Sequence, residues 1–463
     1  MTRFRAIVLC LLLAGAIPGV RAADPVPLRA DVSARLVLVP TIGGPAGAAF
    51  AWVQVLPGDD RPLFRVLVHG GKLLVEPAGR LPADTGAICL VPSPSGEGGA
   101  LLLGRPGRID LLPVHFRGDA VVETSRTLVE DPRLAPRWFD SADLDGDGTA
   151  EFLVETWAGA LVLRRQEEGW GAAGWLPLPR YGWFVGGALH LRAGHLLGTP
   201  PGLAALRAWA EDVPDGVVRV FRGTPVSELA TEAPAGPPPL LARVRFPRDY
   251  AWEGASLLVP GDPDRAILLR GAPAGKLLGG TPDLLVVRLD PRTGATITTP
   301  ELVVTLPLDA LEDSPLLDLV DADGDGTRDI VITARARGGR GRSVAVEVLR
   351  GLAGGRFAGR LLAWQGRVGR SASALAMSDL DGDGRLDVLA SSEDALAWWR
   401  GGEGRPGSLP WSRKPAATWK IPWADGRATV GGATLVDGER RWQVVPVYPS
   451  GRDATTLLAL PLP

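Results

Sequence analysis

Cysteine and histidine are scarce in this sequence, and their scarcity excludes several kinds of site. The 463 residues include two cysteines and four histidines. Cys10 lies in an apolar N-terminal stretch that we expect to be removed, which leaves Cys89 alone and excludes an intrachain disulfide. His190 and His195 are five residues apart with no Glu between them, so they lack the spacing of a zinc-protease helix.

Long apolar runs and an excess of one charge are also missing. After residue 22, no run reaches the roughly 20 apolar residues that a membrane-spanning helix needs. The formal charge is −2, and loss of the three arginines at positions 3, 5 and 21 would take it to −5. We therefore expect no membrane span, and neither nucleic acid nor an anionic membrane as a partner.

Residues 1–22 have the pattern of a secretory signal peptide. Arg3 and Arg5 precede an apolar stretch, and Val20-Arg-Ala22 supplies small residues for cleavage. We therefore expect residues 23–463 to form one exported domain, located in the periplasm or outside the cell.

No catalytic motif is complete. Gly402 to Gly407 has the glycine spacing of a dinucleotide-binding turn, but Pro406 and the following Ser-Leu-Pro prevent the helix that this turn requires. Gly369-Arg-Ser-Ala-Ser lacks the last glycine of a nucleophile elbow. Paired catalytic carboxylates stay open, because acids are plentiful. We name no catalytic residue and no organic cofactor, and favour a protein without enzymatic activity.

Carboxylates are abundant and are concentrated in three similar loops of nine residues. Asp143–Glu151, Asp321–Asp329 and Asp379–Asp387 each carry acids at positions 1, 3, 5 and 9 and a glycine at position 6. Four acids so close together would repel one another without a cation. Alternate carboxylates on a tight loop offer the hard oxygen ligands that Ca²⁺ prefers. Three copies predict three calcium sites rather than three solvated turns.

The residues after each loop exclude an EF-hand. That motif needs a Glu at position 12 and flanking helices, whereas position 12 is Val154, Ile332 or Ala390. Short apolar runs follow the loops, such as Phe152-Leu-Val and Ile330-Val-Ile. Runs of this kind indicate buried strands. These are calcium loops that lead into β-strands.

The spacing of the loops predicts a repeat architecture. Their first acids lie at 143, 321 and 379, so the intervals are 178 and 58 residues, and 178 is about three times 59. Repeats of this length that are built from strands favour a β-propeller with four-stranded antiparallel blades. We therefore expect an all-β chain folded as a single propeller.

Weaker copies of the repeat set the predicted number of blades. Together with the three acid loops they give seven repeat centres, near residues 93, 143, 199, 262, 321, 379 and 437. Residues 30–80 leave extra strand material, which either closes the last blade or forms an eighth. We expect seven blades, with eight as the alternative. If the N-terminal strands close the ring, residues 30–57 pair with residues 430–460.

Two stretches resemble a known family. Phe139-Asp-Ser-Ala-Asp-Leu-Asp-Gly-Asp-Gly and Ala374-Leu-Ala-Met-Ser-Asp-Leu-Asp-Gly-Asp-Gly are similar to FG-GAP/VCBS repeats, whose blades resemble the calcium-binding blades of integrin α-chain propellers. The Gly-Ala-Pro element that often follows the acid loop is absent, and Ser391-Ser-Glu stands in its place in the third copy. The resemblance implies calcium-binding blades and a role in binding or assembly.

Each loop is expected to hold one Ca²⁺ through its four acids and the backbone carbonyl at position 7. The predicted ligands are Asp143, Asp145, Asp147, Thr149 and Glu151; Asp321, Asp323, Asp325, Thr327 and Asp329; and Asp379, Asp381, Asp383, Arg385 and Asp387.

Aromatic residues gather near the C-terminus. Trp411, Trp419 and Trp423 lie in a less periodic segment, where they either pack in the core, the favoured interpretation, or stack on a ligand. The resemblance to integrin-type propellers implies that partner contacts lie mainly on the face opposite the calcium loops, where we expect the segments Arg335–Arg342 and Gly401–Trp423.

These observations predict an exported, calcium-binding β-propeller that acts as a monomeric binding or scaffold module in adhesion or assembly. Its partner would be an unidentified protein or glycan. Two alternatives stay open. A carbohydrate-active enzyme on a propeller scaffold would need a polar cluster at the central channel, and a purely structural cell-surface protein would have no concave polar site.

Overall fold

The computed structural model describes most of residues 28–176 and 316–462, and between these ranges it describes the strands and residues 228–232. Within the two main ranges it leaves out residues 42–45, 54–60, 94–96, 119–121, 137–138, 143–150, 157–158, 167–168, 324, 328, 337–342, 353–355, 370–371, 393, 403–408, 422–426, 429–431 and 449–453. The predicted signal peptide, residues 1–22, lies outside the described residues. Among those described, no helix is long and apolar enough to cross a membrane.

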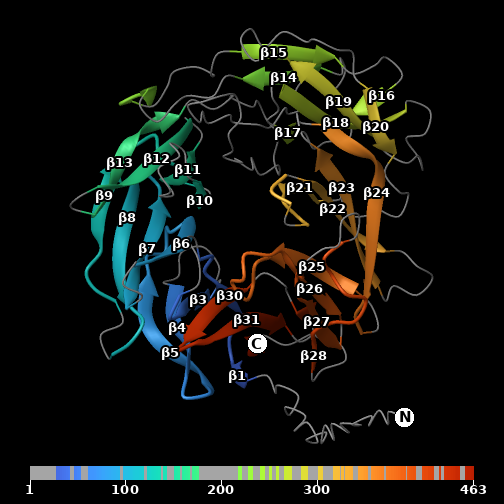
Figure 1. Ribbon diagram of the computed structural model, residues 1–463. Helices are drawn as coiled ribbons and strands as arrows, with labels where there is room; N and C mark the ends of the chain where they lie inside the picture. Colours follow the sequence, from blue (N-terminus) through green and yellow to red (C-terminus); the bar gives the residue numbers. More distant parts are fainter. Residues whose placement is uncertain are drawn as a thin grey trace, which may run out of the picture.

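The regular elements of the described part are all β-strands, and they form eight antiparallel sheets (Figure 1). Five of these sheets have four strands that pair in sequence order. Their members are β2 (Leu36–Leu38), β3 (Ala49–Val53), β4 (Arg61–His69) and β5 (Lys72–Leu81); β6 (Ala87–Pro92), β7 (Gly98–Arg105), β8 (Arg108–His115) and β9 (Arg126–Glu130); β10 (Phe139–Ala142), β11 (Glu151–Thr156), β12 (Gly159–Gln166) and β13 (Gly169–Leu176); β21 (Leu316–Val320), β22 (Asp329–Ala336), β23 (Ser343–Leu352) and β24 (Arg356–Arg367); and β25 (Ala372–Ser378), β26 (Asp387–Ser392), β27 (Ala395–Trp399) and β28 (Ala417–Lys420). The prediction of an all-β chain with four-stranded antiparallel sheets is confirmed.

The other three sheets depart from this plan in the described part. They comprise β14 (Val217–Phe221) and β15 (Leu240–Arg245); β16 (Tyr250–Trp252), β17 (Leu257–Val259), β18 (Arg265–Pro273), β19 (Asp283–Leu289) and β20 (Glu301–Thr305); and β29 (Arg427–Ala428), β30 (Ala433–Asp437), β31 (Arg440–Tyr448), β32 (Thr455–Leu462) and β1 (Leu28–Val32). Figure 1 shows the sheets around a central space, with β10, β21 and β25 toward the inside and β9, β13 and β24 toward the outside.

The predicted repeat phase matches the sheets. The centres near 93, 143, 262, 321, 379 and 437 each fall between two paired strands, or at the end of one, near the start of a sheet, as in β21–β22 and β25–β26. The centre near 199 lies outside the described residues. The sheet β2–β5 adds a further pair of strands in the same position, β2 and β3, which no acid marked in the sequence.

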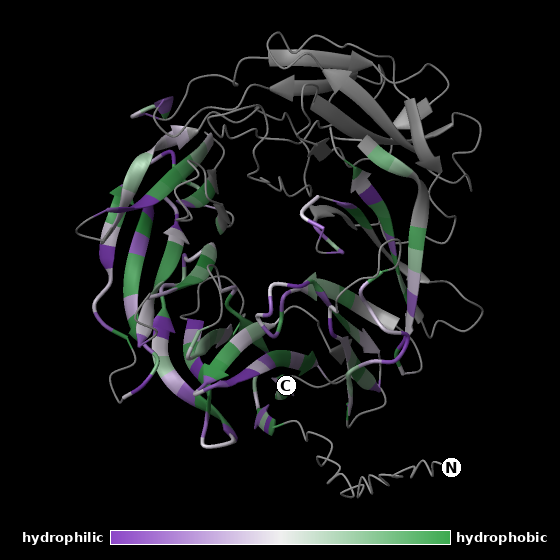
Figure 2. Ribbon diagram, in the orientation of Figure 1, coloured by the Kyte–Doolittle hydropathy of each residue, from purple (hydrophilic) through white to green (hydrophobic). Residues whose placement is uncertain are grey.

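In the part of the chain whose side chains are described, the apolar clusters lie between neighbouring sheets rather than within any one of them. Phe50 of β3 packs in one apolar cluster with Leu101 of β7, and Trp399 of β27 shares another with Val346 of β23. Figure 2 shows the corresponding apolar colouring along these strands. Such clusters arise because each strand alternates its side chains between the two faces of its sheet. The sheets that share these clusters therefore depend on one another.

The two ends of the chain meet in one sheet. β1 pairs with β32, with Leu28 opposite Ala459 and Val32 opposite Thr455. Thr455 Oγ1 also accepts a hydrogen bond from the backbone N–H of Leu36 at 2.9 Å. The expected pairing of residues 30–57 with residues 430–460 is present only in part, because β1 completes the C-terminal sheet whereas residues 36–81 form a sheet of their own.

Removal of β1 should open this sheet. A chain that starts at residue 33 would leave the edge of β32 unpaired, and exposed edges promote association between molecules. We expect this chain to melt at a lower temperature than a chain that starts at residue 23, as measured by thermal denaturation. We also expect it to associate as its concentration rises, as measured by light scattering after gel filtration. A shortened chain with the same melting temperature and mass would show that β1 does not hold the ends together.

Candidate metal centre

Two of the three acid loops lie within the described residues. They are the β21–β22 loop and the β25–β26 loop, and Figure 1 places both on the inner side of the arrangement of sheets. In the first loop, Asp143, Asp145, Asp147 and Thr149 lie outside the described residues, so their role as ligands stays a prediction.

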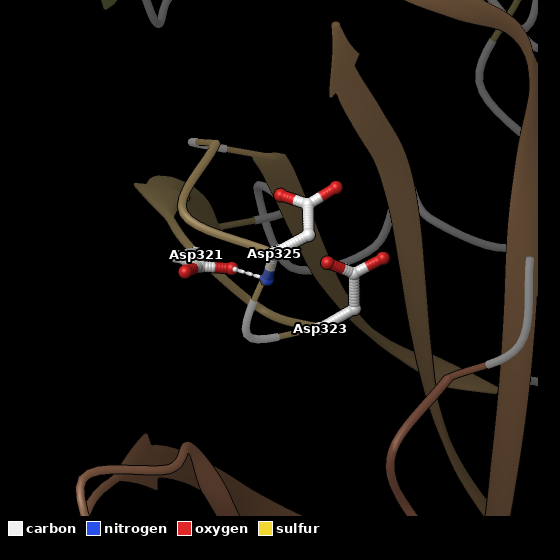
Figure 3. Close-up of side chains that lie close together, drawn as sticks. All are labelled: Asp321, Asp323 and Asp325. Carbon is white, nitrogen blue, oxygen red and sulfur yellow. Dashed lines mark hydrogen bonds between the residues drawn. The ribbon is translucent and has the colours of Figure 1, made fainter. Parts of the chain in front are cut away.

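The β21–β22 loop brings its first three acids together. One carboxylate oxygen from each of Asp321, Asp323 and Asp325 lies within 4.8 Å of the others (Figure 3). Asp321 shapes the turn, because its two oxygens accept the backbone N–H groups of Asp325 at 3.1 Å and Gly326 at 2.8 Å. Asp325 Oδ1 accepts the N–H of Thr327 at 2.8 Å. The carboxylates thereby converge around one point.

The β25–β26 loop repeats this geometry. Asp379, Asp381 and Asp383 also present oxygens within 4.8 Å of one another. The oxygens of Asp379 accept the N–H groups of Gly382 at 2.6 Å and Gly384 at 3.0 Å. Two loops 58 residues apart in the sequence therefore fold alike, as their shared pattern predicted.

Glycine permits the tight turn of both loops. At position 6, Gly326 and Gly384 have φ values of 83° and 81°, a region that other residues adopt at a cost. At position 4 of the β25–β26 loop, Gly382 has φ of 77°, and a Cβ there would lie 1.9 Å from the guanidinium of Arg441. An acid loop of this shape therefore needs the glycines that its sequence places between the aspartates.

The residues present fit a hard cation. The Asp323 side chain is 6% exposed, yet its buried Oδ1 has no hydrogen-bond partner among the described residues. A buried oxygen without a donor costs free energy, and a metal ion would satisfy it. Grouped carboxylates are the donor set that Ca²⁺ takes in proteins. The backbone carbonyls of Thr327 and Arg385 stay predicted further ligands.

The acids at position 9 lie apart from these groups and are fully buried. Asp329 Oδ2 accepts the backbone N–H of Ala322 at 3.0 Å, and its Oδ1 accepts that of Gly351 at 2.8 Å. Asp387 repeats the arrangement, and its Oδ1 accepts the N–H of Gly401 at 2.6 Å. Each of these carboxylates therefore ties its loop to the end of the third strand of the sheet, a role that the sequence did not predict.

Burial changes the titration of both position 9 acids. It raises the pKa of Asp329 to about 6 against the lowering effect of the backbone N–H groups, and the charges of Asp323 and Asp325 raise it further. Burial likewise raises the pKa of Asp387 to about 6. Both carboxylates are thus costly to bury, and the hydrogen bonds that they accept offset part of that cost.

Sequence reasoning missed an arginine on each loop. Arg350 places Nε 2.7 Å from Asp323 Oδ2 and Nη2 2.7 Å from Asp325 Oδ2. Arg400 makes the same pair of contacts with the acids at positions 3 and 5 of its loop, at 2.6 and 3.1 Å. A guanidinium is planar and always charged, so it suits two carboxylates side by side. Each loop therefore already has a cation from its own sheet.

The first repeat keeps part of this arrangement. Glu151, its position 9 acid, is fully buried, and Arg164 Nε lies 3.6 Å from its Oε1. Arg164 and Arg400 each follow the first acid of their loop by 21 residues, and Arg350 follows by 29. The recurrence of an arginine near the end of the third strand could have been noticed in the sequence, most clearly in the Arg-Gly pairs at 350 and 400.

The tryptophans near the C-terminus pack in the core. Trp411 and Trp419 are 5% and 2% exposed, which confirms the favoured interpretation, and Trp423 lies outside the described residues. The indole N–H of Trp411 donates to the carbonyl of Leu386 at 2.7 Å, and its ring contacts Trp364 edge-to-face at 5.8 Å between centroids. Neither tryptophan is available to stack on a ligand.

The predicted partner face needs correction. The segment Gly401–Trp423 was expected opposite the calcium loops, yet Gly401 bonds to Asp387 and Trp411 bonds to Leu386 of the β25–β26 loop. In an antiparallel sheet the turn between strands 1 and 2 and the turn between strands 3 and 4 lie at the same end, which explains the placement. Most of the other segment, residues 337–342, lies outside the described residues.

Comparison with protein families supports the repeat assignment. Residues 321–390 match the family model of the FG-GAP-like repeat, a segment that runs from the second acid loop through the third. The match confirms, for this part of the chain, the resemblance that the acid loops indicated. A search of curated protein sequences finds no significant match.

Several solved structures are similar over most of the chain at low identity. The β-propeller domain of the Trilobed protease from Pyrococcus furiosus, described as having an open velcro topology, is 9% identical over 92% of this chain and 95% of that one, with a TM-score of 0.32. A protein from Lactobacillus plantarum is 11% identical over 83% and 87%, with a TM-score of 0.29. These values are too low to carry an argument about function.

Substitution of Trp411 tests its role in the core. Trp411→Ala should lower the free energy of unfolding by about 3–5 kcal/mol, because it empties a large buried site. Trp411→Phe keeps most of the packing but loses the bond to Leu386, and we expect a smaller loss of about 1 kcal/mol. Urea denaturation of both variants measures the difference. Wild-type stability in Trp411→Ala would contradict the assignment.

A second prediction concerns the tie made by Asp387. Asp387→Asn keeps the shape of the side chain but replaces one acceptor with a donor that faces the N–H of Gly401 or Leu380. We expect a loss of about 1–3 kcal/mol in the free energy of unfolding. Asp437→Asn, at the end of β30, removes a carboxylate outside the loops and should have little effect. Equal stability of the two variants in urea would show that Asp387 ties nothing.

Proposed function

We propose that this protein is an exported, calcium-stabilised β-propeller that serves as a binding or scaffold module. The observation that carries the proposal is the pair of loops in which three carboxylates converge, one of them with a buried oxygen that no described hydrogen bond satisfies. The match of residues 321–390 to the FG-GAP-like repeat gives independent support from the sequence.

We further propose that the sheets close into a ring of eight blades. The described strands form eight sheets, one more than the seven repeat centres, because residues 36–81 supply an additional one. Pairing of β1 with β32 brings the first strand of the chain into the last sheet, and such pairing would close a ring. The domain would then comprise residues 23–463 after removal of the signal peptide.

The binding role follows from what such a scaffold offers. Calcium at the inner turns would hold the loops rigid, and loops on a rigid scaffold are where binding residues gather. We propose that the partner is a protein or a glycan, and that the protein acts in adhesion or assembly as a monomer. Because Trp411 and Trp419 are buried, the contact surface would be made by other side chains.

Calcium removal is the direct test of the metal. A ligand bound only by the folded state contributes about 2.7 kcal/mol per site at a hundredfold excess over its dissociation constant. A chelator should therefore lower the melting temperature, and Mg²⁺ should restore it poorly because it demands stricter geometry. Asp323→Ala should reduce the size of the chelator effect. An unchanged melting curve, with no calcium in elemental analysis of the purified protein, would refute the calcium role.

The binding role is tested by affinity capture with the exported, calcium-loaded protein. We expect a protein or glycan to be retained in calcium and released by chelator. The matched control is Asp381→Ala at a temperature where it is folded. Retention that does not depend on calcium would separate the binding role from the metal.

A further inference from the structure

The two arginines at the acid loops contact the carboxylates that are the predicted metal ligands. Arg350 and Arg400 each contact the acids at positions 3 and 5, which are the same carboxylates that form the metal group. Two of those acids are nearly enclosed, with Asp323 6% and Asp381 3% exposed. Each guanidinium is therefore a fixed positive charge in contact with the predicted calcium ligands.

We propose that Arg350 and Arg400 are built-in counter-cations that compete with calcium for these carboxylates and so set the calcium affinity of the loops. The inference rests on the proposed calcium role. It assigns to each loop two charge-compensated states, one in which the arginine holds the acids and one in which calcium does.

The competition follows from charge and from geometry. A positive charge within about 4–6 Å of a site disfavours a second positive charge there. The guanidinium keeps its charge at every physiological pH, so deprotonation of the arginine does not relieve this repulsion. Calcium must therefore bind against the repulsion or displace the arginine. The Arg400 side chain is 51% exposed and has solvent to move into.

The same contacts explain how a calcium-free loop would stay folded. In the β21–β22 loop, Arg350 offsets the repulsion between Asp323 and Asp325, while Asp329 holds the N–H of Gly351, the residue next to Arg350. The arginine and the glycine after it thus fasten both halves of the loop to the third strand. Removal of the arginine should weaken the calcium-free loop and strengthen the calcium-bound one.

The proposal is tested by titrating calcium into the protein of residues 23–463 after a chelator has removed any bound metal. Isothermal titration calorimetry would compare the wild type with Arg350→Gln and Arg400→Gln. We expect each substitution to raise the calcium affinity of one site roughly tenfold or more, and to lower the melting temperature measured in chelator. Arg350→Gln is the cleaner variant, because the guanidinium of Arg441 lies beside the other loop at Gly382.

Two controls separate charge at the loop from charge elsewhere. Arg413→Gln removes an arginine from an exposed position between β27 and β28 and should change neither the affinity nor the melting temperature. Arg350→Lys keeps the positive charge without the two-pronged contact, so its affinity should rise less than that of Arg350→Gln. If Arg350→Gln does not fold, Arg350→Lys replaces it in the titration. A calcium affinity of Arg350→Lys at or below that of the wild type would then overturn the proposal.

The outcomes distinguish this inference from the calcium role itself. Calcium binding by the wild type with equal or weaker binding by the glutamine variants would overturn the competition and leave the calcium role intact. Binding by the glutamine variants alone would support the competition in its strongest form, with arginine in place of the metal. Folded variants that all fail to bind calcium would overturn both.

Discussion

Burial of apolar surface between neighbouring sheets is the constraint on which the described part of this structure depends. All five residues of β27 are buried, and its adjacent tryptophans illustrate why. Trp398 packs in a cluster with Leu458 of the C-terminal sheet, whereas Trp399 packs with Val346 of the preceding sheet. A strand whose neighbouring side chains belong to two different cores cannot be stable in an isolated sheet. The β25–β28 sheet therefore depends on the sheets on both of its sides.

At the inner turns the fold must compensate clustered negative charge, just as the sheets must bury apolar surface. Three aspartates converge in each described acid loop, and a fourth acid is fully buried behind them. Backbone N–H groups donate hydrogen bonds to Asp329 and Asp387, and a guanidinium contacts the acids at positions 3 and 5. Because the guanidinium and one of the two N–H donors come from the end of the third strand, the loop and the sheet are stabilised together. A cation would add to a turn that its own sheet already holds.

The parts predicted from the sequence are those encoded by local patterns. Short apolar runs gave the strands, and the spacing of the acids placed β21–β22 and β25–β26 in phase, because a repeat imposes its period on the fold. The clustering of Asp379, Asp381 and Asp383 followed from alternate positions on a tight turn. The sheet at residues 36–81 carries no acid loop, so its count as a separate unit was left open.

The parts that the sequence did not reveal are contacts across the sheet. Asp387 and Gly401 are 14 residues apart and meet only because β26 and β27 pair. The partner face was misplaced for the same reason, since the end of the sheet to which a segment belongs depends on strand order. The sequence favoured core packing for Trp411 but could not identify its neighbours, and its packing partner Trp364 comes from a neighbouring sheet.

The pairing of β1 with β32 also determines how the molecule would respond to force. Leu28, the first residue of β1, lies opposite Ala459 near the end of the chain, so both termini leave the pair at the same end. Tension applied between the termini would separate the two strands one hydrogen bond at a time, as a zipper opens, instead of loading all the bonds at once. If the force acted between one terminus and some other point on the surface, it would not act directly across the β1–β32 pair. A protein tethered at both ends would thus yield first where its ends join.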